Sequence, residues 1–308
     1  MPYILQERIR IGISLCQFGA KVRWNHRGWN RIQEIEREMN HFIWTPVCPE
    51  LNSGLGVTRD PIRLVGGHGD DFWAGNAQIK NRRGLDVSDA MRTGLTATMA
   101  LLHQAQVEAF VFMEGSPSCG VYRTTLKNRR MGKPPGAFGS LLLKERLFLI
   151  PAEDLNSPVK WWDWRRRLHA FVWLKRQELQ SKEQIYDIWG HFKFVCQEVN
   201  QTRAREIGRQ LAAMPKRFSA KFAEEWRGDV LMLLRQPSTI ARVAAAMQKH
   251  YTHYMKHINP ESEPLAPPVS DMSRRKFVAK LHEMEKKAFL EDFAFKGTPV
   301  LFRETSRR

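Results

Sequence analysis

Three cysteines of this chain each come at the end of a short apolar segment that favours a β-strand, and this placement constrains the fold most. The cysteines are Cys16, Cys48 and Cys119, and the segments are residues 8–15, 41–47 and 107–113. Glycine or proline follows each cysteine within three residues, which indicates that the strand gives way to a turn. The carboxyl ends of parallel strands meet at one edge of an α/β sheet, so the three thiols are expected to converge there.

The first half of the sequence alternates strand-like and helical segments. Residues 89–106 carry apolar side chains at helical spacing, and Ser88 is placed to cap the start of that helix. Strands that alternate with helices are typical of βαβ units, which build parallel sheets. Beyond Pro151 nearly every periodic segment is helical. We expect an α/β domain with a mostly parallel sheet over residues 1–152, followed by an all-α domain over residues 156–308.

The chain is strongly basic along its whole length. Its 308 residues carry a net charge of +17. Residues 1–150 hold 20 Lys and Arg against 13 Asp and Glu, and residues 151–308 hold 29 against 19. An excess of this size favours a polyanionic partner, and a nucleic acid fits better than a membrane because no basic amphipathic anchor stands out. The alternative is a basic protein whose charge serves only solubility.

Signals for export or membrane insertion do not stand out in the sequence. No apolar run approaches the roughly 18 residues that span a bilayer, and the N-terminus has no signal-peptide pattern. Four cysteines in so long a chain do not make a disulfide framework. We expect a cytoplasmic protein with no membrane partner and no obligatory protein partner.

The three cysteines at strand ends suit a metal centre. Three converging thiolates can hold an iron–sulfur cluster and leave one iron without a protein ligand. Zinc is the alternative metal, although the Cys-x₂-Cys pairs typical of structural zinc are missing. A cysteine nucleophile is a further alternative, but the sequence singles out no histidine as its partner. Cys196 lies on the apolar stripe of a helix, where a thiol behaves as a small core side chain.

Short motifs cover nearly the whole first half of the chain. They are Cys16-x₂-Gly19-x₂-Val22-Arg23, Cys48-Pro49-Glu50, Gly54-Leu55, Arg59-x-Pro61, Gly84-x-Asp86-Val87-Ser88 and Ser116-Pro117-Ser118-Cys119-Gly120. In these motifs residues 8–151 resemble the thiouracil desulfidase family, whose members bind a [4Fe–4S] cluster through three cysteines. Residues 156–260 look like the helical YbgA-like domain that often follows it. The combination is similar to desulfidases that convert 4-thiouridine in transfer RNA to uridine.

The resemblance implies roles for residues of the first domain. Cys16, Cys48 and Cys119 match the ligands of a [4Fe–4S] cluster whose fourth iron is open and acts as a Lewis acid. Glu50 matches the catalytic carboxylate, which moves protons during hydrolysis; the alternative is an ordinary loop carboxylate. Ser116 and Ser118 are candidate hydrogen-bond donors to the base, with Ser116 favoured, and the alternative is that both cap the following turn.

The second domain is the expected platform for transfer RNA. Aromatic and cationic side chains alternate over residues 161–167, which suits base stacking and phosphate contacts, although half of that helix face could be core. A stripe of cations at seven-residue spacing is either a second contact surface or a plain exposed face. The candidate RNA-binding residues are Arg165, Arg166, Arg167, Arg242, Lys249 and Lys256.

Other functions remain open at this point. A desulfidase for free thiouracil-type bases or nucleosides needs no basic second domain. A non-catalytic iron–sulfur sensor that binds nucleic acid needs neither Glu50 nor the serine-containing loop. Electron transfer and a zinc-stabilised binding module are the remaining alternatives.

Overall fold

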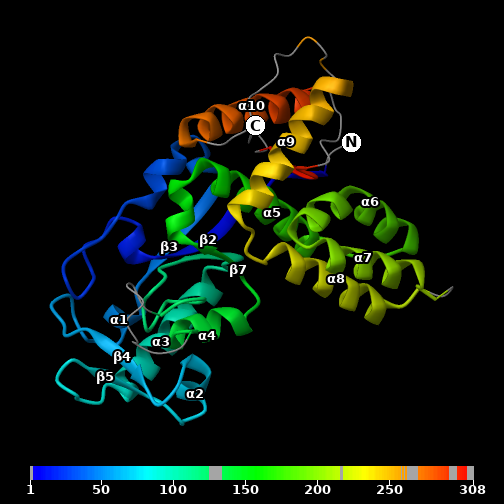
Figure 1. Ribbon diagram of the computed structural model, residues 1–308. Helices are drawn as coiled ribbons and strands as arrows, with labels where there is room; N and C mark the ends of the chain where they lie inside the picture. Colours follow the sequence, from blue (N-terminus) through cyan, green and yellow to red (C-terminus); the bar gives the residue numbers. More distant parts are fainter. Residues whose placement is uncertain are drawn as a thin grey trace, which may run out of the picture. The chain divides into compact units, whose positions relative to one another are not determined.

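The computed structural model describes residues 3–124, 134–215, 218–257, 259, 261, 270–290 and 297–303. It divides into two compact units, one of residues 8–156 and the other of residues 1–7 together with 157–308 (Figure 1). They are called below the cysteine unit and the helical unit, and each is described by itself. None of the described helices is long and apolar enough to cross a membrane.

The cysteine unit is built on a four-stranded parallel sheet with the strand order β3-β2-β6-β7. The strands are β2 (Ile9–Ser14), β3 (Phe42–Val47), β6 (Ala109–Phe112) and β7 (Phe148–Pro151). All four residues of β6 are buried, as expected for a strand in the middle of a sheet covered on both faces. Ser14 lies beside Val47 in the register, so β2 and β3 end at the same level.

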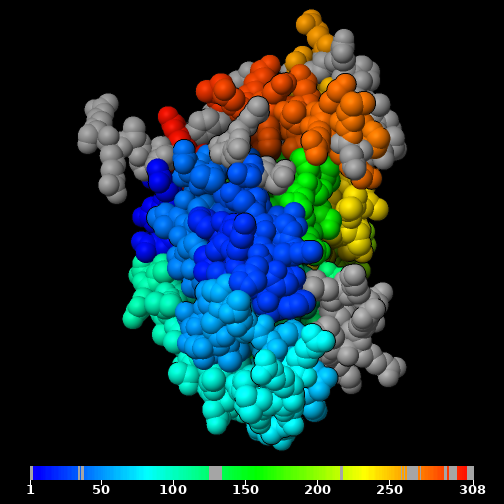
Figure 2. All heavy atoms as spheres, turned by 90° about the vertical axis from the view of Figure 1, so that its left-hand side faces the viewer, coloured from blue at the N-terminus to red at the C-terminus, as the bar shows by residue number. Residues whose placement is uncertain are grey.

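Helices and shorter elements complete the cysteine unit. α3 (Ser88–Gln104) buries the stripe of Met91, Leu95 and Leu102 against the sheet core. The remaining elements are η1 (Leu15–Gln17), η2 (Arg31–His41), α1 (Pro49–Asn52), β4 (Ile62–Val65), α2 (Gly69–Trp73), β5 (Gln78–Asn81), α4 (Ala137–Lys144) and η3 (Ala152–Asn156). On the face shown in Figure 2, most of this unit's surface belongs to the segment drawn blue to cyan, from β2 to β5.

Ser88 does not cap α3 in the way that the sequence predicts. It is the first helical residue, and its amide donates to the Asp86 carboxylate at 2.9 Å. Its own hydroxyl accepts the amide of Ile79 at 2.9 Å, which ties the helix to β5. The N-cap position itself is Val87, and the first amide of the helix is satisfied by the acidic residue two positions before it.

The helical unit consists of α5 (Pro158–Arg176), α6 (Lys182–Val199), α7 (Gln201–Ala212), α8 (Ala220–Leu234), α9 (Ile240–His257) and α10 (Asp271–Leu290). Ser157, Ser181, Asn200 and Ser219 cap four of these helices by accepting a backbone amide in the first turn. α5 is the central helix, since 14 of its 19 residues are buried. Cys196 is fully buried on α6, as its position on the apolar stripe predicts.

The fold class predicted from the sequence is confirmed, with one addition. β1 (Tyr3–Leu5) pairs in parallel with β8 (Val300–Phe302) and forms a small sheet inside the helical unit. The predicted first domain began at residue 1, but this pairing places residues 1–7 with the helical unit. A strand of three residues gives no periodic signal of its own, so its partner, almost 300 positions away, decides where it belongs.

Candidate active site

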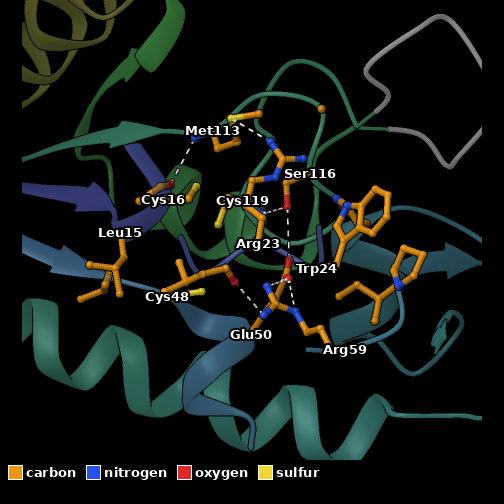
Figure 3. Close-up of a pocket in the computed structure, with 17 residues that line it drawn as sticks. Leu15, Cys16, Arg23, Trp24, Cys48, Glu50, Arg59, Met113, Ser116 and Cys119 are labelled. Atoms are coloured by element: carbon orange, nitrogen blue, oxygen red, sulfur yellow. Dashed lines mark hydrogen bonds and ion pairs between the residues drawn. The ribbon is translucent and has the colours of Figure 1, made fainter. Parts of the chain in front are cut away.

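The three strand-end cysteines line one cavity at the carboxyl edge of the parallel sheet (Figure 3). Cys16 lies in η1 directly after β2, and Cys48 precedes α1 directly after β3. Cys119 lies in the loop that follows β6. Because β3, β2 and β6 are neighbours in the sheet, three separate segments deliver their thiols to the same place. The cavity has a volume of about 140 Å³.

A buried carboxylate shapes the loop that carries Cys119. Glu114 is 7% exposed, and its two oxygens accept the amides of Val121, Tyr122 and Arg123 at 3.1–3.3 Å. The amide of Gly115 closes the loop on the carbonyl of Arg123 at 2.9 Å. The Glu114 carboxylate thus accepts the hydrogen bonds that a neighbouring strand would otherwise accept from these amides.

The amino end of α4 supports the same loop from the other side. The amides of Ala137 and Phe138 donate to the carbonyls of Pro117 and Ser118 at 3.0 and 2.9 Å. A Cβ at Gly136 would lie 2.5 Å from the Ser118 carbonyl oxygen, so only glycine allows this approach. The Cys119 loop is therefore held by backbone contacts.

The thiols are costly to ionise without a cationic group. Burial raises the pKa of all three, most for the enclosed Cys119, and the Glu50 carboxylate raises each further. The pKa of Cys48 rises to about 11. A bound metal group reverses this balance, because coordinated thiols are deprotonated.

The donor set fits an iron–sulfur cluster. Within the described ranges no three His, Cys, Asp or Glu side chains gather closely enough to hold a single ion. The three thiols instead line the wall of a cavity, which is the arrangement that a cluster with one iron per cysteine requires.

Glu50 lines the cavity and is clamped by an arginine. It lies in the first turn of α1, two residues after Cys48. Arg59 donates to its Oε2 through Nε at 2.8 Å and also through Nη2. The Nη1 of Arg59 binds the carbonyls of Val22 and Gly56 at 2.8 and 2.7 Å. Both side chains are nearly buried, at 13% exposure for Glu50 and 5% for Arg59.

The two serines extend a hydrogen-bonded chain from Glu50. Ser118 Oγ donates to Glu50 Oε1 at 2.6 Å, and Ser116 Oγ lies 2.9 Å from Ser118 Oγ. Ser118 is fully buried, whereas Ser116 lines the cavity. Ser116 Oγ also accepts the amides of Ser118 and Cys119 at 3.3 and 3.2 Å, so it caps the turn as well. The turn-capping interpretation of Ser116 therefore describes a contact in the structure, and its role as a donor to the base stays a prediction.

Sequence reasoning missed an arginine-rich cavity that adjoins the first. It has a volume of about 190 Å³ and shares Arg23 and Met113 with the cysteine cavity. Arg27 and Arg31 also line it, and the guanidinium groups of Arg23 and Arg31 lie 5.1 and 5.7 Å from the Trp29 ring centre. The signal was present in the run Arg23-Trp24-Asn25-His26-Arg27-Gly28-Trp29-Asn30-Arg31.

The structure overturns the prediction that Arg165, Arg166 and Arg167 contact RNA. All three are buried, with Arg167 fully enclosed. Asp163 pairs with Arg166 at 2.7 Å and with Arg167 at 2.6 Å, and Arg165 pairs with Glu285 at 2.6 Å. The physical reason is the central place of α5, because every face of a helix that is surrounded by other helices is buried.

The other three RNA-binding candidates lie exposed on α9, as their seven-residue spacing predicts. Arg242 Nη1 donates to the carbonyl of Val199 at 2.7 Å, at the end of α6. Lys249 and Lys256 line a cavity within the helical unit. Their role in binding stays a prediction.

Comparisons with known proteins match the part of the chain that contains this site. Residues 11–154 match the model of the 2-thiouracil desulfurase family. The Bacillus subtilis (strain 168) protein YbbK, described as uncharacterized, is 29% identical over 150 residues, which are 47% of this chain and 97% of YbbK. A solved [4Fe–4S]-dependent thiouracil desulfidase, TudS, shares 24% identity over 49% of this chain and 93% of its own, with a TM-score of 0.38. The matched segment, residues 11–154, contains every residue of the cysteine site.

Proposed function

We propose that this protein is an iron–sulfur-dependent desulfidase that removes sulfur from 4-thiouridine in transfer RNA. The reaction consumes water and yields uridine and hydrosulfide, with no net oxidation or reduction. One observation carries the proposal: three thiols from neighbouring strand ends share a cavity with the hydrogen-bonded chain Glu50–Ser118–Ser116. The match of residues 11–154 to the 2-thiouracil desulfurase family model supports a thiocarbonyl on a pyrimidine ring as the group attacked.

Cys16, Cys48 and Cys119 are the residues that would hold the cluster. When bound, a [4Fe–4S] cluster with one open iron supplies a Lewis acid for a soft thiocarbonyl sulfur. The apolar wall of the cavity limits the water that reaches the reacting carbon. Trp24, exposed at the cavity mouth, offers a flat surface on which the base can stack (Figure 3).

Glu50 is placed to move the protons of the hydrolysis. Arg59 occupies its Oε2 with two donors, which keeps the carboxylate oriented. Its Oε1 points toward Ser118, and through Ser118 the chain reaches Ser116 at the cavity surface. Glu50 accepts a proton from the attacking water, and the serines orient the base and carry a proton toward the departing sulfur.

The arginine-lined cavity favours a nucleotide over a free base. It adjoins the cysteine cavity, and Glu153, which pairs with Arg123 at 3.5 Å, is the only acidic side chain among the described residues that line it. Guanidinium groups bind phosphate through paired donors, whereas thiouracil carries no phosphate. The basic charge of the whole chain supports RNA as the source of that phosphate.

The test is a direct assay under anaerobic conditions. Cluster-loaded protein is incubated with thiolated transfer RNA, with 4-thiouridine and with 4-thiouracil, and loss of sulfur is followed by nucleoside analysis and hydrosulfide release. We expect transfer RNA to be the preferred substrate. Equal or better turnover of free 4-thiouracil supports a desulfidase of free thiouracil-type bases or nucleosides. No desulfidation of any substrate supports a non-catalytic sensor.

A paired variant sharpens the assay. Replacing Arg27 and Arg31 together by Gln removes two phosphate donors outside the cysteine cavity. We expect turnover of transfer RNA to fall by about tenfold or more, since a charged hydrogen bond contributes about 1.5–3 kcal/mol. Turnover of 4-thiouracil should stay unchanged. A parallel loss on both substrates would contradict a phosphate role.

A further inference from the structure

The helical unit contains a large cavity of its own, formed by residues of α6 and α9. Its volume is about 620 Å³, which lies in the range of sites that enclose a ligand of nucleotide size. Phe194 of α6 lines one wall, and α9 contributes Gln248, Lys249, His253 and Lys256. Nothing in the proposed hydrolysis uses this cavity.

The charge of the cavity favours an anionic ligand. Lys249 and Lys256 are two turns apart on α9, so both ammonium groups lie on the same side of the helix. Glu198 is the only acidic side chain among the described lining residues. The charge of Glu198 is already compensated by Arg166, whose Nη1 lies 2.7 Å from the Glu198 Oε2.

Two further groups favour a ligand that carries a base or a sugar in addition to a phosphate. The Gln248 Oε1 atom is buried and has no hydrogen-bond partner among the described residues. A buried acceptor of this kind calls for an N–H or O–H donor, such as a base amino group or a ribose hydroxyl. Phe194 adds an aromatic ring, on which a base can stack. The Lys249 Nζ atom lies 5.9 Å from the centre of that ring.

We propose that this cavity binds a nucleoside phosphate, with the phosphate between Lys249 and Lys256 and a base or sugar donor on Gln248. The ligand has two possible sources with the same chemistry. It is either an unstacked nucleotide of transfer RNA, in which case the inference rests on the proposed function, or a free mononucleotide. The site lies in a different unit from the cysteine cavity and is therefore a second nucleotide site of the chain.

The experiment measures binding with full-length, cluster-loaded protein. UMP, AMP, uridine and inorganic phosphate are titrated by calorimetry, and transfer RNA by filter binding, for the unaltered protein and three variants. Lys249→Gln and Lys256→Gln each remove one cavity cation. Lys221→Gln makes the same charge change on α8 at a side chain that is 87% exposed and outside the cavity, so it is the matched control.

A free nucleotide as ligand predicts that UMP or AMP binds more tightly than uridine and phosphate, and that each cavity variant weakens it about tenfold or more. A nucleotide of RNA predicts the same loss for transfer RNA relative to Lys221→Gln. Gln248→Met should weaken the same ligand while leaving inorganic phosphate unaffected. The inference is overturned if mononucleotides do not bind and transfer RNA binds the cavity variants and the control equally.

The readout separates this inference from the proposed function. If the protein desulfurises nothing but the cavity variants lose ligand binding, the second site is supported and the proposed desulfidase activity is contradicted. If desulfidation is normal and the cavity variants change the binding of no ligand, the proposed desulfidase activity is supported and the second site is contradicted.

Discussion

Glu50 is the residue on which the two sides of the cysteine cavity meet. Arg59 holds one of its oxygens, and Ser118 holds the other. A carboxylate accepts from both partners at once, whereas an amide that accepts from Arg59 would turn its NH₂ group toward Ser118 and reverse that hydrogen bond. Both the chemistry proposed for Glu50 and its hydrogen bonds to Arg59 and Ser118 therefore favour a carboxylate at this position.

Replacing Glu50 by Gln separates its role in proton transfer from its role in the local structure. The side chain keeps its volume but cannot accept a proton, so we expect desulfidation to fall by about 10²- to 10⁴-fold. Iron and sulfide content should stay close to that of the unaltered protein, because the three thiols are untouched. Turnover is measured as hydrosulfide release per cluster. Normal turnover, or loss of the cluster in this variant, would show that the assigned role is wrong.

At the scale of an element, the loop of residues 114–123 is organised by a carboxylate outside the reacting set. Glu114 binds three consecutive backbone amides, and burial raises its pKa despite these donors. It acts through the loop and not on a substrate, so it is a positioning residue for Cys119 and Ser116.

Glu114→Ala should release the loop without unfolding the sheet. Three amides lose their acceptor, and each unsatisfied buried group costs about 1–3 kcal/mol. We expect the iron content after purification to drop by about half or more, while the circular dichroism spectrum stays unchanged. Glu145→Ala is the control, since that carboxylate is half-exposed and pairs with His103 on the surface. Equal iron content in the two variants would remove Glu114 from this role.

How far the sequence predicts these elements depends on the range of the deciding contacts. The strands before Cys16 and Cys48 were predicted within one or two residues, because apolar runs and following turns are local signals. The linked Glu50, Ser116 and Ser118 came from motifs that resemble a family, while their hydrogen bonds depend on the neighbouring places of β3 and β6 around β2. α5 misled the sequence analysis, since a run of arginines looks solvent-exposed until Asp163 and Glu285 are known to lie beside it.

At the scale of the whole molecule, buried ion pairs make the helical unit sensitive to acid. Glu285 is buried; burial raises its pKa, but Arg165 and its other partners lower it more, to a net value of about 2. Burial and Arg166 act in the same opposed way on Glu198, whose pKa also falls to about 2. Both carboxyls have an ordinary pKa of 4.5, so unfolding raises their proton affinity.

The sign of the pH dependence follows from that difference. Each carboxyl contributes stability that is complete above about pH 4.5 and is lost as the pH falls toward 2, on the order of 3 kcal/mol per group. We expect the urea midpoint of the helical signal to fall steeply over this range. Glu285→Gln should be less stable at pH 7 and show a shallower fall. The same slope in both proteins would contradict the assignment.

The pairing of β1 with β8 sets an order of events during synthesis. The cysteine unit is contiguous in the sequence, whereas the helical unit begins before it and ends after it. On the ribosome, residues 8–156 are complete while β1 still lacks β8, which is made almost 300 residues later. In the sequence, the cysteine unit thus lies between β1 and the rest of the helical unit. The small sheet of β1 and β8 can form only after the whole cysteine unit has been synthesised.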